Sequence, residues 1–216
     1  MKNLFTKLSV CLLMASSLFL TSCSTNSDEI LTASEKNNTL EVSSGKLATT
    51  YTIKRYVFNR ESAVGGLGHV GVGFEVRTTN PTSVIYYYGG VENSKGSPAV
   101  GLGGANGGWW GTTASGSIMF SVMKNTYGYS RYKFEKAFMN ISTTRVTNSI
   151  NEIKYFPNRG YLLLGNNCMN ASYDVLNQGG GLILPNPTIA TSLAYIPNNW
   201  YNLFVSFNGW SGSVNL

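Results

Sequence analysis

Histidine and cysteine are scarce in this chain, with one histidine and three cysteines among 216 residues. Two of the cysteines, Cys11 and Cys23, lie close to the N-terminus, so the rest of the chain holds one thiol and one imidazole. These two groups cannot assemble the usual zinc ligand set, and we expect no bound metal and no cofactor. Charged residues make up only 12% of the chain, and the formal net charge of +6 is not gathered into a dense basic run. We therefore expect no nucleic-acid partner.

The N-terminus lacks an apolar run long enough for a membrane-spanning helix, which needs ~20 residues. Instead, Lys2 and Lys7 precede a shorter apolar stretch over residues 8–20, which is the pattern of a secretion signal. Residues 20–23, Leu-Thr-Ser-Cys, resemble the lipobox of bacterial lipoproteins, in which the cysteine is acylated. The resemblance implies that residues 1–22 are a lipoprotein signal peptide and that Cys23 carries the lipid, with palmitate among its acyl chains. The protein would then be anchored to the outer membrane of a bacterial cell envelope, on its periplasmic face or at the cell surface.

Residues 23–46 are mostly Ser, Thr, Asn, Lys and Glu, which is too polar a composition to bury much surface. We interpret them as a lipidated tether. The remaining residues, 47–216, are ample for one domain with a single core.

The remaining cysteine, Cys168, follows Asn166 and Asn167, and asparagine is a favoured helix N-cap. Apolar and small residues recur at helical spacing from Cys168 onward, and three glycines at residues 179–181 end the pattern. A thiol in the first turn of a helix lies at the positive end of the helix dipole, which favours the nucleophilic thiolate. The alternative is that Cys168 is a small buried hydrophobe, as free cysteines often are.

The single histidine, His69, begins a stretch in which valines and a phenylalanine alternate strictly with other residues. This alternation predicts a strand over residues 69–76 with one apolar face. The other face carries His69, Gly71, Gly73 and Glu75, and its glycines suit the floor of a cleft beside the imidazole. The alternative is a structural histidine whose two ring nitrogens are satisfied by hydrogen bonds.

The rest of the chain predicts an α+β fold. β-branched and aromatic runs predict strands at residues 49–58, 84–88, 117–123, 132–138 and 201–207. A helix capped by Ser142 or Thr143 and ending before Pro157 should serve packing rather than chemistry. We expect the glycine-rich residues 96–116 to form either a mobile loop at a cleft edge or a flexible insertion. Residues 182–185 should be extended, and residues 188–195 should form a turn of helix.

The order of these features resembles the circularly permuted papain-like cysteine hydrolases, the group of NlpC/P60-like peptidases, PPPDE peptidases and lecithin:retinol acyltransferase-like enzymes. In that group a histidine on an early strand, in a Gly-His-x-Gly context, precedes a cysteine at a later helix start, in an Asn-Cys context. The resemblance covers residues 49–207 and implies an antiparallel sheet packed against a few helices. It also implies that Cys168 is the nucleophile and His69 its base, so we expect the Cys168 sulfur within about 4 Å of a His69 ring nitrogen.

Two supporting roles are less determined by the residues. No second histidine exists to orient His69, and Glu75, Tyr86 or Asn106 could do so. The backbone N–H of Cys168, with the side chain of Asn166 or Asn167, could stabilise an oxyanion, although the two asparagines serve equally well as helix caps.

These features support two hypotheses. The first is a lipid-anchored cysteine hydrolase, an amidase or peptidase that acts on peptidoglycan peptides or another envelope amide. Acyl transfer would use the same Cys-His dyad. The alternative is a catalytically inactive surface lipoprotein in which Trp109, Trp110 and the tyrosines contact glycan or protein.

Overall fold

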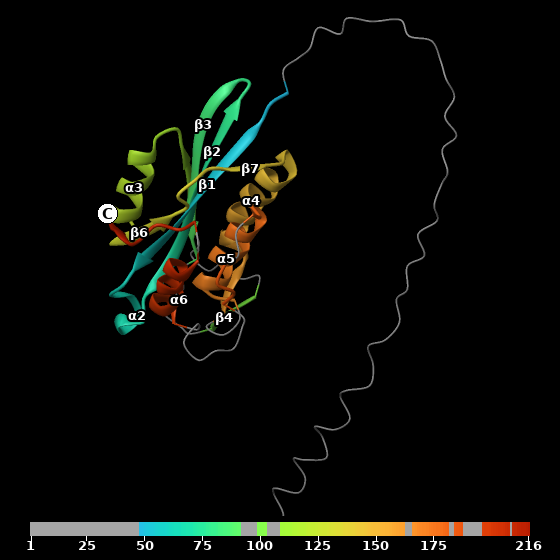
Figure 1. Ribbon diagram of the computed structural model, residues 1–216. Coiled ribbons are helices and arrows are strands. Elements are labelled where there is room, and N and C mark those ends of the chain that lie inside the picture. Colours follow the sequence, from blue (N-terminus) through green and yellow to red (C-terminus); the bar gives the residue numbers. More distant parts are fainter. Residues whose placement is uncertain are drawn as a thin grey trace, which may run out of the picture. The chain divides into compact units, whose positions relative to one another are not determined.

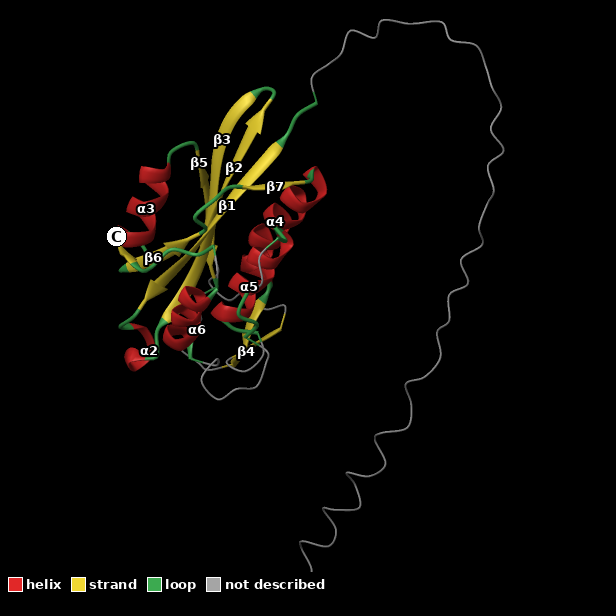
Figure 2. Cartoon of the chain, in the orientation of Figure 1, coloured by secondary structure: helices red, strands yellow, loops and turns green. Residues whose placement is uncertain are grey.

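An antiparallel sheet forms the centre of the structure. This structure is a computed structural model, and it describes residues 48–91, 99–102, 109–162, 166–181, 184–187, 196–207 and 209–216. These residues belong to the unit Lys46–Leu216. Helix α3 lies on one face of the sheet, and α4, α5 and α6 lie on the other, as Figures 1 and 2 show. The architecture is therefore α+β, as the sequence predicts.

The sheet has the strand order β5-β3-β2-β1-β6-β9, and β7 also pairs with β1. Its strands are β1 Tyr51–Arg60, β2 His69–Thr79, β3 Thr82–Gly90, β5 Trp109–Thr113, β6 Arg131–Phe134, β7 Met139–Ile141 and β9 Val214–Asn215. A separate pair is formed by β4 Ala99–Leu102 and β8 Gly160–Leu162. The strands expected at residues 49–58, 69–76 and 84–88 are confirmed, and each pairs with its neighbour along the chain.

The helices are α2 Ala63–Gly66, α3 Gly116–Asn125, α4 Thr143–Tyr155, α5 Cys168–Gln178 and α6 Pro197–Leu203, with 3-10 turns at Phe156–Asn158 and Phe204–Ser206. The predicted cap of α4 is confirmed, because the Ser142 hydroxyl accepts a hydrogen bond from the backbone N–H of Arg145 at 3.4 Å. Helix α5 ends at Gln178 with Gly179 as its C-cap, as the glycine run predicts.

Two separate cores cover the two faces of the sheet. The core on the side of α4, α5 and α6, which we call the α5-side core, contains the apolar residues of β2 together with residues of all three helices. The core on the side of α3, the α3-side core, consists of Tyr56, Phe58, Tyr88, Met119, Met123 and Tyr129. Residues of β2 from His69 to Val76 are buried on both faces, so neither face of this strand borders open solvent.

Two predicted strands are helices in the structure. Residues 117–123 belong to α3, where Met119 and Met123 lie one helical turn apart and are both buried. Residues 201–203 are the end of α6, and a 3-10 turn follows them. Pro197 lies in the first turn of α6, and Trp200 and Tyr201 of this helix are buried. Both errors have the same cause, since a short apolar run fits a strand and a buried helix equally well by periodicity.

The glycine-rich residues 96–116 are not simply a loop, which corrects the sequence expectation. They include β4, which pairs with β8, and β5, which extends the central sheet beyond β3. Asn106 and residues 188–195 lie outside the described residues, and so do residues 182 and 183. The described residues 184–186 have no regular secondary structure.

Candidate functional site

Cys168 is the first residue of α5, and the local sequence explains why the helix begins there. The Asn167 side-chain oxygen accepts hydrogen bonds from the backbone N–H groups of Met169 and Asn170, at 2.9 and 3.3 Å. In return, the Asn170 side-chain oxygen accepts the N–H of Asn167 at 3.2 Å, which completes a capping box. Asn167 therefore acts as the helix cap, one of the two roles the sequence left open.

The side chain of Cys168 is part of the α5-side core. The residue is 2% exposed, its thiol is free, and it is grouped with Val70, Val72 and Trp200. This is the environment of a small buried hydrophobe.

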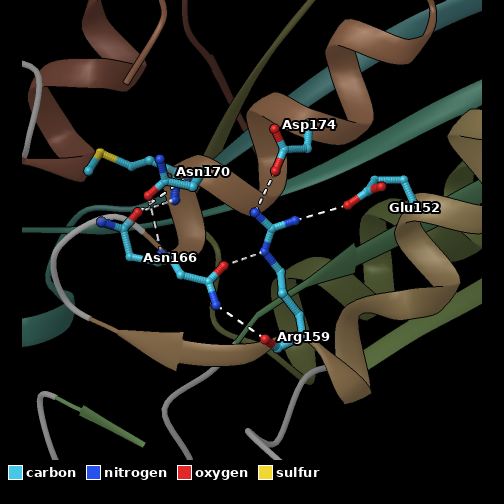
Figure 3. Close-up of polar contacts among 7 residues, drawn as sticks. Glu152, Arg159, Asn166, Asn170 and Asp174 are labelled. Carbon is cyan, nitrogen blue, oxygen red and sulfur yellow. Dashed lines mark hydrogen bonds and ion pairs between the residues drawn. The ribbon is translucent and has the colours of Figure 1, made fainter. Parts of the chain in front are cut away.

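Asn166, the other candidate oxyanion donor, is held by Arg159. The Arg159 Nε donates to the Asn166 side-chain oxygen at 2.7 Å, and the Asn166 amide donates back to the Arg159 carbonyl at 3.2 Å. Figure 3 shows the same guanidinium reaching Glu152 of α4 and Asp174 of α5. This network, which we call the Arg159 clamp, fixes the segment before Cys168 to both helices.

His69 belongs to the other face of the sheet. Successive side chains of a strand point to opposite faces, and Val70 lies in the α5-side core. Consistently, the His69 ring lies 6.0 Å from the ring of Tyr129, a member of the α3-side core. His69 itself is 5% exposed.

The glycines that follow His69 do not form the floor of a cleft, which corrects the sequence expectation. A Cβ atom on Gly71 would lie 2.5 Å from the Tyr129 hydroxyl, and one on Gly73 would lie 3.1 Å from the Met119 sulfur. The space above both residues is therefore filled by side chains of the α3-side core. These glycines permit close packing of buried groups.

The His69 side chain and Cys168 accordingly lie on opposite faces of β2. Cys168 is a member of the α5-side core, whereas the His69 ring lies beside Tyr129 of the α3-side core. A general base has to lie within hydrogen-bond reach of the group that it deprotonates, directly or through one water. The described contacts therefore give no support to the expected Cys-His dyad.

Glu75 and Tyr86 also lie away from His69. They are paired across β2 and β3, and Glu75 is six residues from His69, a span of about 20 Å along an extended strand. The buried Glu75 carboxylate accepts hydrogen bonds from Tyr56 at 3.1 Å and Arg77 at 2.6 Å. Burial, and then the charge of Glu75, raises the pKa of Tyr86. Neither residue can orient His69, and the two form a separate polar cluster.

The structure adds a feature that the sequence does not predict. A groove of about 420 Å³ is lined by four residues of α4 and one of α5: Asn148, Asn151, Glu152, Tyr155 and Gln178. The four α4 residues are spaced i, i+3, i+4, i+7, which places them on one side of the helix. That polar spacing is visible in the sequence, although the pattern of α4 predicts a packing role only.

No three His, Cys, Asp or Glu side chains of the described residues are grouped closely enough to hold a metal ion. Among the helices that the structure describes, none combines the length and apolar character needed to cross a membrane. Comparison of the chain with known protein families, with curated proteins and with solved structures found no match.

Proposed function

We propose that this chain is a lipid-anchored binding protein of the bacterial cell envelope, in which a papain-like scaffold without Cys-His catalysis holds an envelope glycan. The observation that carries the proposal is the separation of His69 and Cys168 by the sheet. Cysteine hydrolases need a thiol and a base in one site. His69 is the only histidine of the chain, so no other imidazole can replace it.

Three of the residues expected to serve catalysis have structural roles that account for them. Asn167 caps α5, Asn166 is held in the Arg159 clamp, and Cys168 fills the α5-side core. The early glycines of β2 accommodate Tyr129 and Met119. A binding protein needs nothing further from these positions.

The anchor part of the proposal rests on the N-terminal sequence. The secretion signal and the Leu-Thr-Ser-Cys motif support acylation at Cys23, and residues 23–46 would let the domain reach polymers beside the membrane. Neutral glycan strands are the envelope component that the groove between α4 and α5 suits best, because its lining offers amide, carboxylate and phenol groups.

The test compares the wild-type lipoprotein with its Cys168→Ser variant, both purified in detergent. We expect both proteins to sediment equally with purified peptidoglycan sacculi and neither to release amino groups from them. Cys168 should react with a maleimide far more slowly in the native protein than in urea, since the thiol is 2% exposed. Amine release by the wild type that disappears in Cys168→Ser would overturn the proposal and establish the hydrolase instead.

A further inference from the structure

We infer that the groove between α4 and α5 is the glycan-binding site and that it takes an uncharged, hydroxyl-rich saccharide. This inference rests on the proposed function and assigns it a location. The four lining residues of α4 span seven positions, or about 10 Å of helix, which is long enough for a short oligosaccharide. Gln178, the last residue of α5, closes the opposite side.

The side-chain amides of the groove are available to a ligand. In the described part of the chain, no hydrogen bond engages the side chains of Asn148, Asn151 or Gln178. Each of these amides offers a carbonyl acceptor and two N–H donors. A sugar hydroxyl also donates and accepts, so the amides can pair with neighbouring hydroxyls of one ring.

Tyr155 supplies the apolar part of the groove. Its side chain is 51% exposed although it belongs to a helix packed against the sheet. The C–H face of a pyranose ring can cover an aromatic ring, and a tyrosine adds a hydroxyl at its edge. One tyrosine flanked by amides is therefore suited to a sugar, which is apolar on its ring faces and polar around its rim.

The carboxylate of the groove is held in place by the Arg159 clamp. Figure 3 shows Glu152 and Asp174, from the two helices, converging on the Arg159 guanidinium. The Arg159 to Glu152 distance is 2.9 Å, and Arg159 is 12% exposed. Because one guanidinium is shared by two carboxylates, a net negative charge remains beside the groove, which disfavours an anionic polymer, so a neutral ligand fits better.

A second cavity, of about 380 Å³ beside α3, is a weaker candidate. It is lined in part by Phe120, Lys124, Asn125 and Tyr132. Its polar groups already have partners, because Lys124 donates to the Leu216 carbonyl and Asn125 donates to the Ser121 hydroxyl. A ligand there would have to displace these contacts.

The experiment titrates the wild-type lipoprotein with chitotriose, a neutral N-acetylated trisaccharide, by isothermal calorimetry and by NMR. Three variants, Tyr155→Ala, Asn151→Ala and Gln178→Ala, should each weaken binding by about tenfold, the size of one or two lost contacts. Asn177→Ala is the matched control, since Asn177 is exposed beside Gln178 but does not line the groove, and its affinity should stay within about twofold of wild type. Unchanged thermal melts will show that the variants are folded.

The outcomes separate this inference from the proposed function. If the wild type binds chitotriose and sacculi while all three variants bind equally well, the groove assignment is overturned and the binding function stands. If the wild type binds neither probe, the glycan-binding function fails, and the groove assignment fails with it. Weakening in the three variants but not in Asn177→Ala supports both.

Discussion

The two faces of the central sheet are packed in different ways. On the α3-side, aromatic rings approach strand glycines closely, with Tyr129 above Gly71 and Phe58 beside Gly73. On the α5-side, aliphatic residues of β1 and β2 meet three helices, and buried charges join the layers. Successive side chains of β2 point to opposite faces of the sheet, so residues that are adjacent in its sequence pack in different cores. A pair of candidate residues is therefore plausible only if both belong to the same face.

The largest loss of folding stability should come from mutating the buried charges on the α5 side of the sheet. Arg55 and Glu135 form an ion pair in which both side chains are 1% exposed, and Arg55 also donates to the Leu176 carbonyl of α5. Glu135→Ala would leave the guanidinium buried without a counter-charge. We expect the free energy of unfolding to fall by about 3–5 kcal/mol in urea titrations.

Two controls establish the cause of this loss. Replacing both partners, Arg55→Met with Glu135→Leu, should recover most of the stability because no charge is left unpaired. Glu61→Ala removes the partner of Arg131 from an ion pair in which Glu61 is 58% exposed, and it should cost less than about 1 kcal/mol. Equal losses from Glu135→Ala and Glu61→Ala would contradict the difference in burial.

The next effect concerns the α3-side. Gly71→Ala would place a Cβ atom 2.5 Å from the Tyr129 hydroxyl and 3.1 Å from the Gly89 carbonyl, and we expect it to cost about 2 kcal/mol. Gly73→Ala should cost less, because its nearest neighbours, Met119 and Phe58, would lie 3.1 Å from the new Cβ atom rather than 2.5 Å. Tyr129→Phe should recover part of the Gly71→Ala loss by removing the clashing hydroxyl.

The Gly71→Ala variant also tests whether the α3-side core and the α5-side core are independent. If Cys168 lies across the sheet from Gly71, the losses from Gly71→Ala and Cys168→Ala should add to within about 0.5 kcal/mol in the double variant. Urea titrations of the four proteins measure this. A coupling above about 1 kcal/mol would place both residues in one core and reopen the dyad.

Local signals in the sequence were sufficient for the elements that have them. Ser142 and Asn167 mark the starts of α4 and α5, because a cap acts within one turn and needs no knowledge of the rest of the fold. The alternation after His69 predicts β2 for the same reason. The runs at 117–123 and 201–207 have weaker markers, because the Ser115 side chain makes no cap hydrogen bond and Pro197 lies four residues before the second run. Their packing against the sheet decides that they are helical.

The candidate site was less predictable than the fold. Alternation shows that His69 and Val70 face opposite ways, but it does not show which of the two faces meets α5. That depends on which core each helix covers, a tertiary property. The groove between α4 and α5 could not be predicted for the same reason. The sequence places Asn148 and Tyr155 on one side of a helix, but it does not show that Gln178 lies opposite them.

The smallest expected effect is a change of stability with pH, caused by Lys133, another buried charge on the α5 side of the sheet. Its Nζ donates to the Tyr201 carbonyl at 2.9 Å and lies 4.5 Å from the centre of the Tyr201 ring. Burial, with a smaller contribution from Arg131, lowers the pKa of Lys133 from 10.5 to about 8. Between pH 8 and 10.5 the unfolded chain binds a proton at this residue that the folded chain has released. Stability should therefore rise with pH in that window, by up to about 1 kcal/mol per pH unit.

Urea titrations between pH 7 and 9.5 measure this slope, and Lys133→Met should remove it. The range stops there because burial raises the pKa of Tyr201 to about 12, so ionisation of the unfolded tyrosine reverses the slope above pH 10. Below pH 8 both states carry the charged lysine, and the contribution of Lys133 should be constant. If Lys133→Met keeps the wild-type slope, Lys133 is solvated in the folded protein, and the α5-side core is wetter than its packing indicates.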